Sequence, residues 1–266
     1  MITSISDREL VAILAQNSDS SYITVQKAAE VLKVSTRSAA IKLAALARRG
    51  WILRAKRGIY LILPIEVSPG QLTTSEDPWI LGNKLFSPCY IGGWSAVEYW
   101  GLTEQLFNST LVITAANIRN KEIKILNQNF RLFNTSEARI MDLNKVWRGN
   151  SEVLISSKER TIVDCLTFPE LCGGIQHLAS IMTNYANDSE QNYPAIIDNA
   201  MKFGSGATWK RLGYLCEKIW PNQIEILSTT RKHITSGYAK LDPRVNDKGT
   251  LIRKWRLWIN VVINTE

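Results

Sequence analysis

The stretch VLKVSTRSAAIKLAALARRGWILRAKRGIYLILPI, residues 31–65, decides the fold of the N-terminal part of this chain. It contains no acidic residue. Its eight cations are Lys33, Arg37, Lys42, Arg48, Arg49, Arg54, Lys56 and Arg57. A helical pattern passes into two short runs rich in apolar residues, which is the outline of a winged helix-turn-helix. Because positive charge without a neutralising anion favours a polyphosphate partner, DNA is the first partner to consider.

Three helices are expected in this part of the chain, and each begins at a residue suited to N-capping. The predicted N-caps are Ser6, Thr24 and Ser35, and Glu9 completes a capping box with Ser6. The third helix ends at Gly50, where a residue with positive φ is often needed. The two strands that follow are expected to be joined by a basic turn over residues 55–58, which would form the wing.

The third predicted helix has two different faces. One face is apolar and is expected to pack: Ala40, Leu43, Leu46 and Ala47. In a helix-turn-helix, the N-terminal part of this helix enters the major groove, where arginine pairs with guanine and small apolar groups contact the thymine methyl. The predicted DNA-binding residues are therefore Ser35, Thr36, Arg37, Ser38 and Lys42 on the helix, Arg48 and Arg49 at its end, and Arg54, Lys56 and Arg57 in the hairpin.

The alternative for these cations is the solvated face of a small helical domain that never contacts DNA. Three features together favour DNA binding: the absence of acidic residues, the glycine that ends the helix, and the two-stranded continuation.

Charge divides the chain into modules. Residues 1–63 carry ten cationic and four anionic residues, a net charge of +6, whereas the net charge is −3 over residues 64–230 and +5 over residues 231–266. Several prolines interrupt the polar stretch at the start of the second region, which predicts a linker there. We expect an α+β protein with a winged helix-turn-helix domain at 1–63, a linker at 64–78 and a larger mixed α+β domain at 79–266.

Within the larger domain, two serine–glutamate pairs have capping-box spacing, Ser95 with Glu98 and Ser156 with Glu159. The alternation in residues 251–263 predicts one strand near the C-terminus. Its cations and two that precede it form a candidate second basic surface for nucleic acid: Arg244, Lys248, Arg253, Lys254 and Arg256. The alternative is a solvated edge strand whose cations prevent aggregation.

Several classes of protein are excluded by composition. The chain is 45% hydrophobic, so disorder is not expected as its main state. Its four cysteines form no CxxC pair and only two histidines accompany them, so we predict neither a metal site nor a cofactor. No apolar run approaches the roughly 20 residues needed to span a bilayer, and no signal peptide is recognised, so we expect a cytoplasmic protein without a membrane partner.

Catalytic motifs are also missing from the sequence. It contains no GxSxG, HExxH or P-loop string, and the two histidines, His177 and His233, lie far apart. We therefore predict a binding protein rather than an enzyme.

Four ordered strings resemble a known family. With the winged helix, the strings WSAVEYWGL (94–102), SSKERTIVDCL (156–166), GATWKRLGYLCEKI (206–219) and the closing LDP and KWRLWIN resemble the AbiEi-like antitoxins of type IV, abortive-infection toxin-antitoxin systems. The resemblance implies a repressor that binds inverted repeats in its own promoter. It also implies a larger domain that counters a nucleotidyltransferase-like toxin without forming a stable complex.

The resemblance also assigns residues. It matches Thr36, Arg37, Ser38 and Lys42 to the DNA-reading helix of the family and Lys56 with Arg57 to its wing. Glu159, Arg160 and Asp164 match an ERT-D string, for which an architectural role is the simpler interpretation: a helix cap and an i,i+4 ion pair. Cys165 and Cys216 are expected to pack in the core.

Two other functions stay open. The chain could be a ligand-responsive winged-helix regulator without antitoxin activity, which a pocket lined by tryptophans and tyrosines would favour. It could also neutralise a toxin by direct contact, which requires an extended exposed apolar surface.

Overall fold

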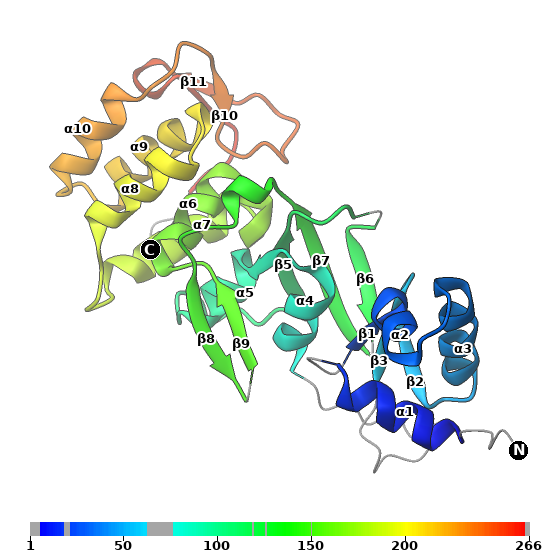
Figure 1. Cartoon of the computed structure of the whole chain (residues 1–266). Helices are drawn as coiled ribbons and strands as arrows, with labels where there is room; N and C mark the ends of the chain where they lie inside the picture. The colour runs from blue at the N-terminus through cyan, green and yellow to red at the C-terminus, as the bar shows by residue number, and fades with distance from the viewer. Residues whose placement is uncertain are drawn as a thin grey trace, which may run out of the picture. The chain divides into compact units, whose positions relative to one another are not determined.

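The computed structural model describes residues 6–18, 22–62, 77–118, 120–125, 127–149 and 151–263, without the side chains of Ala55 and Lys56. The α+β fold class is confirmed (Figure 1). The chain divides into two compact units, which we call unit 1 (Met1–Leu85 with Lys124–Gln128) and unit 2 (Phe86–Ile123 with Asn129–Glu266). Of the predicted linker at 64–78, only the last two residues lie within the described part of the chain, so that boundary stays a prediction.

The N-terminal elements of unit 1 occur in the order expected of a winged helix. They are α1 (Asp7–Gln16), β1 (Tyr22–Thr24), α2 (Val25–Leu32), α3 (Thr36–Arg48), β2 (Ile52–Lys56) and β3 (Ile59–Ile62). The strands form an antiparallel sheet in the order β1-β3-β2. The sequence did not predict β1, because a three-residue strand is too short for its alternation to be recognised. After the second hairpin strand, helix α4 (Pro78–Phe86) follows.

All three predicted N-caps of these helices are confirmed. The hydroxyl of Ser6 accepts the Glu9 N–H and the Glu9 carboxylate accepts the Ser6 N–H, as a capping box requires. The hydroxyl of Thr24 accepts an N–H three residues on at 3.1 Å, and that of Ser35 does the same at 3.2 Å. Each cap satisfies a backbone donor that the helix itself cannot satisfy.

The hairpin turn is shorter than predicted. The expected four-residue turn began at residue 55, but β2 continues to Lys56 across an irregularity in its pairing with β3. The turn itself is Arg57-Gly58, where Gly58 has φ +83°. Its carbonyl accepts the N–H of Val25 at 3.0 Å, so the turn is bonded to the first residue of α2.

A six-stranded sheet forms the other large element of the fold. Its order is β6-β7-β5-β4-β9-β8, with parallel pairs β5–β7 and β4–β9 and antiparallel pairs β4–β5 and β8–β9. The strands are β4 (Cys89–Ile91), β5 (Thr110–Thr114), β6 (Glu122–Ile125), β7 (Gln128–Asn134), β8 (Asn144–Arg148) and β9 (Ser151–Ile155). All five residues of β5 are buried, as expected for a strand covered on both faces.

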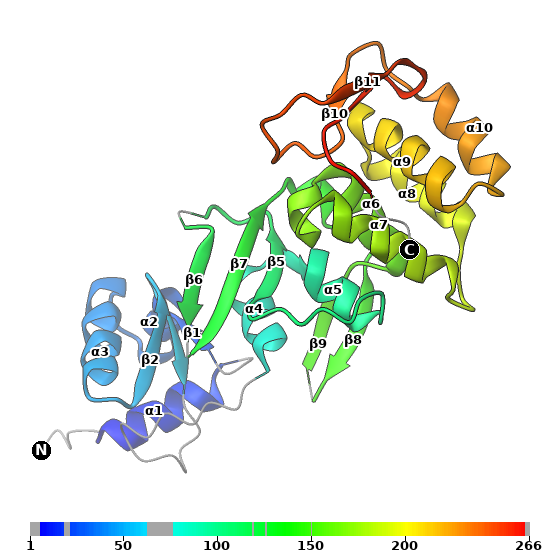
Figure 2. The same ribbon diagram turned by 180° about the vertical axis from the view of Figure 1, so that it is seen from behind.

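Six α-helices and a small sheet complete the described part of unit 2. The helices are α5 (Gly93–Tyr99), α6 (Lys158–Thr167), α7 (Ile175–Ala186), α8 (Tyr193–Phe203), α9 (Gly206–Ile219) and α10 (Ile224–Lys232). The small sheet has the order β10-β12-β11, from β10 (Ala239–Lys240), β11 (Thr250–Ile252) and β12 (Leu257–Ile259). Figures 1 and 2 show α8, α9 and α10 gathered near this small sheet. Helix α6 is buried from Arg160 to Thr167 and lies at the centre of the core.

Both capping boxes predicted in unit 2 are wrong. Helix α5 begins at Gly93, so Ser95 lies inside it, and the Ser95 hydroxyl instead accepts the N–H of Leu111 at 2.9 Å. The N-cap of α6 is Ser157 rather than Ser156. Glu159 consequently makes no cap and accepts a hydrogen bond from the Tyr185 hydroxyl at 2.9 Å.

The single C-terminal strand predicted over residues 251–263 is also wrong. The segment instead contains two short antiparallel strands, β11 and β12. They are separated by a 3-10 turn at Arg253–Trp255 and by Arg256, whose backbone is left-handed with φ 50°. A short tight turn preserves much of the alternation along the sequence, so periodicity alone did not reveal the reversal. Trp255 and Leu257 are nevertheless both buried.

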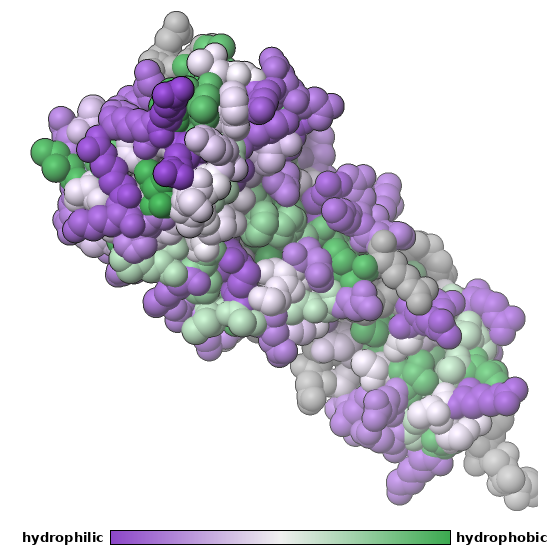
Figure 3. Space-filling model, turned by 90° about the horizontal axis from the view of Figure 1, so that it is seen from above, coloured by the Kyte–Doolittle hydropathy of each residue, from purple (hydrophilic) through white to green (hydrophobic). Residues whose placement is uncertain are grey.

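Among the described residues, no helix has the length and apolar character needed to cross a bilayer. On the face drawn in Figure 3, hydrophobic residues occur in small groups among hydrophilic ones. That face therefore does not favour neutralisation of a toxin through an extended apolar surface.

Candidate nucleic-acid interface

The turn between α2 and α3 sets the direction of α3. Helix α2 ends at Leu32, and its C-cap Lys33 has a left-handed backbone with φ 51°. The N–H of Val34 returns to the carbonyl of Ala29 at 3.0 Å. Ser35 is extended and caps α3. Its hydroxyl also donates to the Ser38 hydroxyl at 2.9 Å, so both serines are occupied in holding the start of the helix.

Helix α3 has one packed and one solvent-exposed face, as predicted. Of the four residues predicted to pack, Leu43 and Leu46 are fully buried in a core shared with α1, α2 and the sheet, whereas Ala40 and Ala47 are only half-buried. Ala39, which was not predicted, is fully buried with the leucines. Burial of each leucine contributes about 1.5–3 kcal/mol to folding, so this face fixes how the helix is seated. The opposite face is available to a partner.

The exposed face of α3 combines charge with an apolar group. Thr36, Arg37 and Lys42 are exposed, and Ile41 beside them is 61% exposed. The first turn contains no acidic residue, so the partial positive charge at the helix N-terminus adds to the two cations. Such a surface can offer hydrogen-bond donors to base edges and phosphates, and a methyl-bearing side chain to thymine.

The remaining predicted cations of unit 1 differ in their partners. Arg48, Arg54 and Arg57 are exposed. Arg49 pairs with Asp7 at 2.8 Å and also donates to the carbonyl of Ala45, so it ties the end of α3 to the start of α1. Because an exposed ion pair contributes roughly 0–1 kcal/mol, a phosphate could replace Asp7 at small cost. The side chain of Lys56, also predicted to bind DNA, lies outside the described part of the chain.

Most cations of the candidate second basic surface have partners within unit 2. Arg244 pairs with Asp242, Lys254 pairs with Glu217, and Arg256 donates to the carbonyl of Ser236. The ammonium of Lys248 lies 4.3 Å from the centre of the Trp258 ring. Arg253, the remaining member, is exposed. These contacts hold the side chains of the C-terminal turn in place.

The ERT-D residues form a buried network in place of a surface ion pair. Arg160 and Asp164 are 0% and 2% exposed, and the predicted i,i+4 ion pair between them measures 3.0 Å. The Asp164 carboxylate also pairs with Arg139 at 3.1 Å and accepts the Tyr90 hydroxyl at 2.8 Å. Burial and the nearby Asp164 charge raise the pKa of Tyr90, which keeps its hydroxyl protonated as a donor. The network joins α6 to β4 and to the segment before β8.

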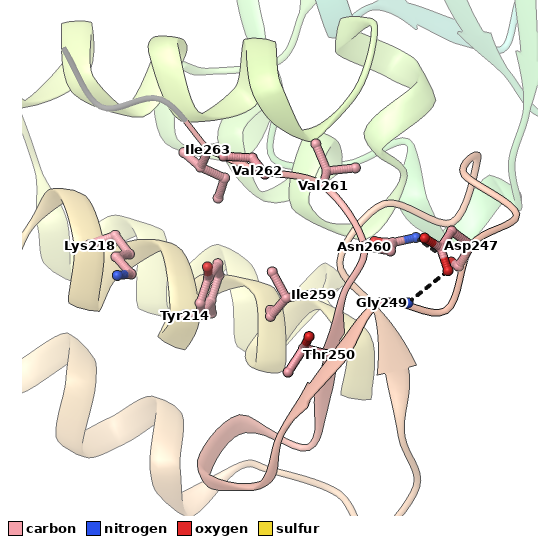
Figure 4. Close-up of a pocket in the computed structure, with 10 residues that line it drawn as sticks. All are labelled: Tyr214, Lys218, Asp247, Gly249, Thr250, Ile259, Asn260, Val261, Val262 and Ile263. Atoms are coloured by element: carbon pink, nitrogen blue, oxygen red, sulfur yellow. Dashed lines mark hydrogen bonds between the residues drawn. The ribbon is translucent and has the colours of Figure 1, made fainter.

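Unit 2 also contains two cavities that the sequence did not predict. The larger, about 550 Å³, lies between α9 and the C-terminal segment (Figure 4). There Tyr214 and Lys218 of α9 lie opposite the aliphatic side chains of Val261, Val262 and Ile263. The smaller, about 320 Å³, is lined by three cations, Lys121, Arg131 and Arg244. No sequence signal groups these three, because they come from separate segments.

An exposed cationic helix face on a small N-terminal unit, followed by a larger α+β unit, is typical of transcriptional regulators. Residues 9–62 match the family described as "Transcriptional regulator, AbiEi antitoxin". The match supports a toxin-antitoxin transcriptional regulator and the AbiEi-like resemblance of the N-terminal part. The resemblance of the larger domain stays a prediction.

The fold of the chain resembles that of a solved structure over most of its length. The "Crystal structure of RV2827C protein from Mycobacterium tuberculosis" superposes with a TM-score of 0.54 at 13% identity, covering 96% of this chain and 92% of that one. At this identity the likeness concerns the fold alone. A search of curated proteins returns no match.

Proposed function

We propose that this chain is a type IV antitoxin that also represses its own operon. In this proposal unit 1 is a winged helix-turn-helix that binds inverted repeats in double-stranded operator DNA. Unit 2 counters a nucleotidyltransferase-like toxin in the cytoplasm without forming a stable complex, and no catalytic step is assigned to the chain. The observation that carries the DNA part is α3, with three fully buried residues on one face and exposed Arg37, Ile41 and Lys42 on the other.

The assignment of α3 to the major groove rests on charge and shape together. Arg37 stands in the first turn, where a recognition helix contacts base edges, and Lys42 follows about one and a half turns later. Arg48 at the end of α3 and Arg57 at the hairpin turn supply further cations for the phosphate backbone. The start of α3 is capped before DNA binds, so the helix that carries Arg37 and Lys42 need not be ordered at the moment of binding, and that entropic cost is avoided.

Operator binding by full-length protein tests this assignment. Arg37→Ala and Lys42→Ala are each expected to weaken binding to the upstream repeats by about 1–3 kcal/mol if they contact bases, as measured by gel shift at fixed salt. Lys27→Ala is the matched control, because Lys27 is an exposed cation of α2 outside the predicted set. Affinity unchanged in both α3 variants would contradict the proposal.

Antitoxin activity is expected to be separable from repression. The full-length R37A/K42A double variant should lose repression of a promoter reporter yet still protect cells that express the adjacent toxin gene from an independent promoter. The double variant must have the same unfolding transition as the unmodified chain. If such a folded variant loses protection together with operator binding, this division of labour is contradicted.

A specific observation also favours the ligand-responsive regulator as the second candidate. Unit 2 holds a cavity lined by three cations. Neither of the two cavities described above is built from several tryptophans and tyrosines, since Trp94 is the one such residue lining this cavity and Tyr214 the one lining the larger cavity.

A further inference from the structure

The cation-lined cavity of unit 2 has the composition of a small-molecule site. Its volume of about 320 Å³ lies within the range of ligand pockets. The wall includes two aromatic side chains, Trp94 and Phe133, with three leucines and a proline between them. Its charged groups are Lys121, Arg131 and Arg244 with one carboxylate, Glu170, which leaves a net charge of +2.

Arg244 is held in place before any ligand arrives. Its Nε and Nη2 donate to the two carboxylate oxygens of Asp242 at 3.1 and 3.0 Å, and its backbone N–H donates to the same carboxylate at 2.9 Å. Asp242 is 2% exposed and also accepts the N–H of Ile175 at the start of α7. The contacts described for the guanidinium use Nε and Nη2, so Nη1 is available to an anionic ligand.

Gly174 makes room for this arrangement. A Cβ at position 174 would lie 1.6 Å from Nη2 of Arg244, and the backbone there has φ +118°, so only glycine fits. The guanidinium therefore rests directly on the backbone at the N-cap of α7. That close approach limits the positions that the arginine can adopt.

The other two cations differ in how readily they can meet an anion. Arg131 forms an exposed ion pair with Glu122. Lys121 is exposed, and no ion pair involves its ammonium among the residues that the structure describes. One fixed cation and one unpaired cation beside aromatic walls match a ligand that carries both a phosphate and a flat ring.

The aromatic side chains of the cavity suit the flat ring of such a ligand, because they can stack on it. Trp94 is only half-buried. Its indole N–H donates to the carbonyl of Ser109 at 2.8 Å, and its ring stacks on the Phe107 ring with the two centroids 5.4 Å apart, so these two contacts orient it. Base–aromatic stacking contributes about 1–3 kcal/mol per base in proteins that bind single-stranded nucleic acid. The aromatic walls therefore favour a nucleobase over a compact anion.

We propose that this cavity binds a nucleoside monophosphate, with the phosphate on Arg244 and Lys121 and the base against Trp94 and Phe133. The proposal is independent of DNA binding by unit 1. It gives unit 2 a ligand that the family resemblance does not assign to it.

Isothermal titration calorimetry of the full chain with AMP, GMP, CMP and UMP tests this site. At least one nucleotide is expected to bind, and adenosine or inorganic phosphate alone should bind at least about tenfold more weakly, because each lacks half of the recognised chemistry. Arg244→Gln and Lys121→Gln should each weaken nucleotide binding by about tenfold or more. Lys232→Gln, an exposed lysine of α10, is the matched control and should leave binding unchanged.

Lys121→Gln keeps the test decisive if Arg244→Gln disturbs the Asp242 contacts and the fold, because the Lys121 side chain is exposed. The proposal is overturned if no nucleotide binds at millimolar concentration. It is also overturned if Lys121→Gln and a folded Arg244→Gln bind as tightly as the unmodified chain, or if adenosine or phosphate alone binds as well as the nucleotide.

Discussion

The cations of α3 and those of α6 and α9 belong to the same residue types but have opposite surroundings. Arg37 and Lys42 are exposed on a helix whose other face is apolar. Arg160 and Arg211 are buried: Arg160 pairs with Asp164, and Arg211 donates to backbone carbonyls of Leu166, Thr167 and Leu241. Burial lowers the pKa of Arg211 to about 10, but the group stays charged at neutral pH.

This comparison separates two uses of positive charge. A buried cation must be matched by acceptors in the fold, so its removal is felt as lost stability. An exposed cation without such acceptors contributes little to stability and is free to meet a partner. Most of the C-terminal cations lie between these cases, since they are exposed but engaged by neighbouring groups of unit 2.

The largest effect on stability is expected at the buried ion pairs of Asp164. Asp164→Ala should lower the free energy of unfolding by about 3–5 kcal/mol, because it leaves Arg160 and Arg139 without their shared carboxylate. Urea denaturation followed by circular dichroism measures this. Arg37→Ala should change the same quantity by less than about 0.5 kcal/mol. Similar losses in the free energy of unfolding for Asp164→Ala and Arg37→Ala would contradict the distinction between buried and exposed cations.

An intermediate effect is expected where α3 begins. Ser35→Ala removes the hydroxyl that accepts the Ser38 N–H and should cost about 1 kcal/mol of stability. Replacement by asparagine, another good N-cap residue, should restore most of that loss. Equal stability of the serine and alanine proteins in thermal denaturation would show that the cap does not stabilise unit 1.

The smallest effect is expected at the exposed carboxylate of α1. The backbone hydrogen bond from Ser6, and then its side-chain hydroxyl, lower the pKa of Glu9 below its usual 4.5. A carboxyl whose pKa is lower in the folded than in the unfolded state stabilises the fold above the unfolded pKa, and this contribution is lost as the pH falls through the folded pKa. Glu9→Gln should therefore destabilise the chain slightly near pH 6, and the difference should shrink as the pH falls below the usual pKa of a glutamate and through the lowered pKa of Glu9. A difference independent of pH would contradict the assignment.

The parts of the fold that the sequence predicted well are those decided by neighbouring residues. The caps at Ser6, Thr24 and Ser35 satisfy donors three residues away, so spacing along the chain was sufficient. Ser95 had the same spacing to a glutamate but bonds to Leu111, sixteen residues away in the adjacent strand β5. Local pattern could not anticipate that competition between a cap and a tertiary contact.

The candidate sites show the same division. The two faces of α3 follow from helical periodicity, and Thr36, Arg37 and Lys42 are exposed as expected. Ser38, also predicted to bind DNA, is half-buried and bonded to Ser35, and Arg49 is engaged by Asp7. The cation-lined cavity requires Lys121, Arg131 and Arg244 to meet from three segments of unit 2. Nothing in the spacing of those residues predicts the meeting, because it depends on strand order and on a glycine at position 174.

The hydrogen bond from the Val25 N–H to the Gly58 carbonyl has a consequence for the length of an operator half-site. It couples the hairpin turn to the start of α2, and α2 is joined to α3 by the capped turn at Ser35. In the proposed complex, the distance between contacts made by α3 and by Arg57 would therefore be constant. Inserting one base pair between the two contacted positions should then disrupt binding, whereas a hairpin free to swing would tolerate the insertion.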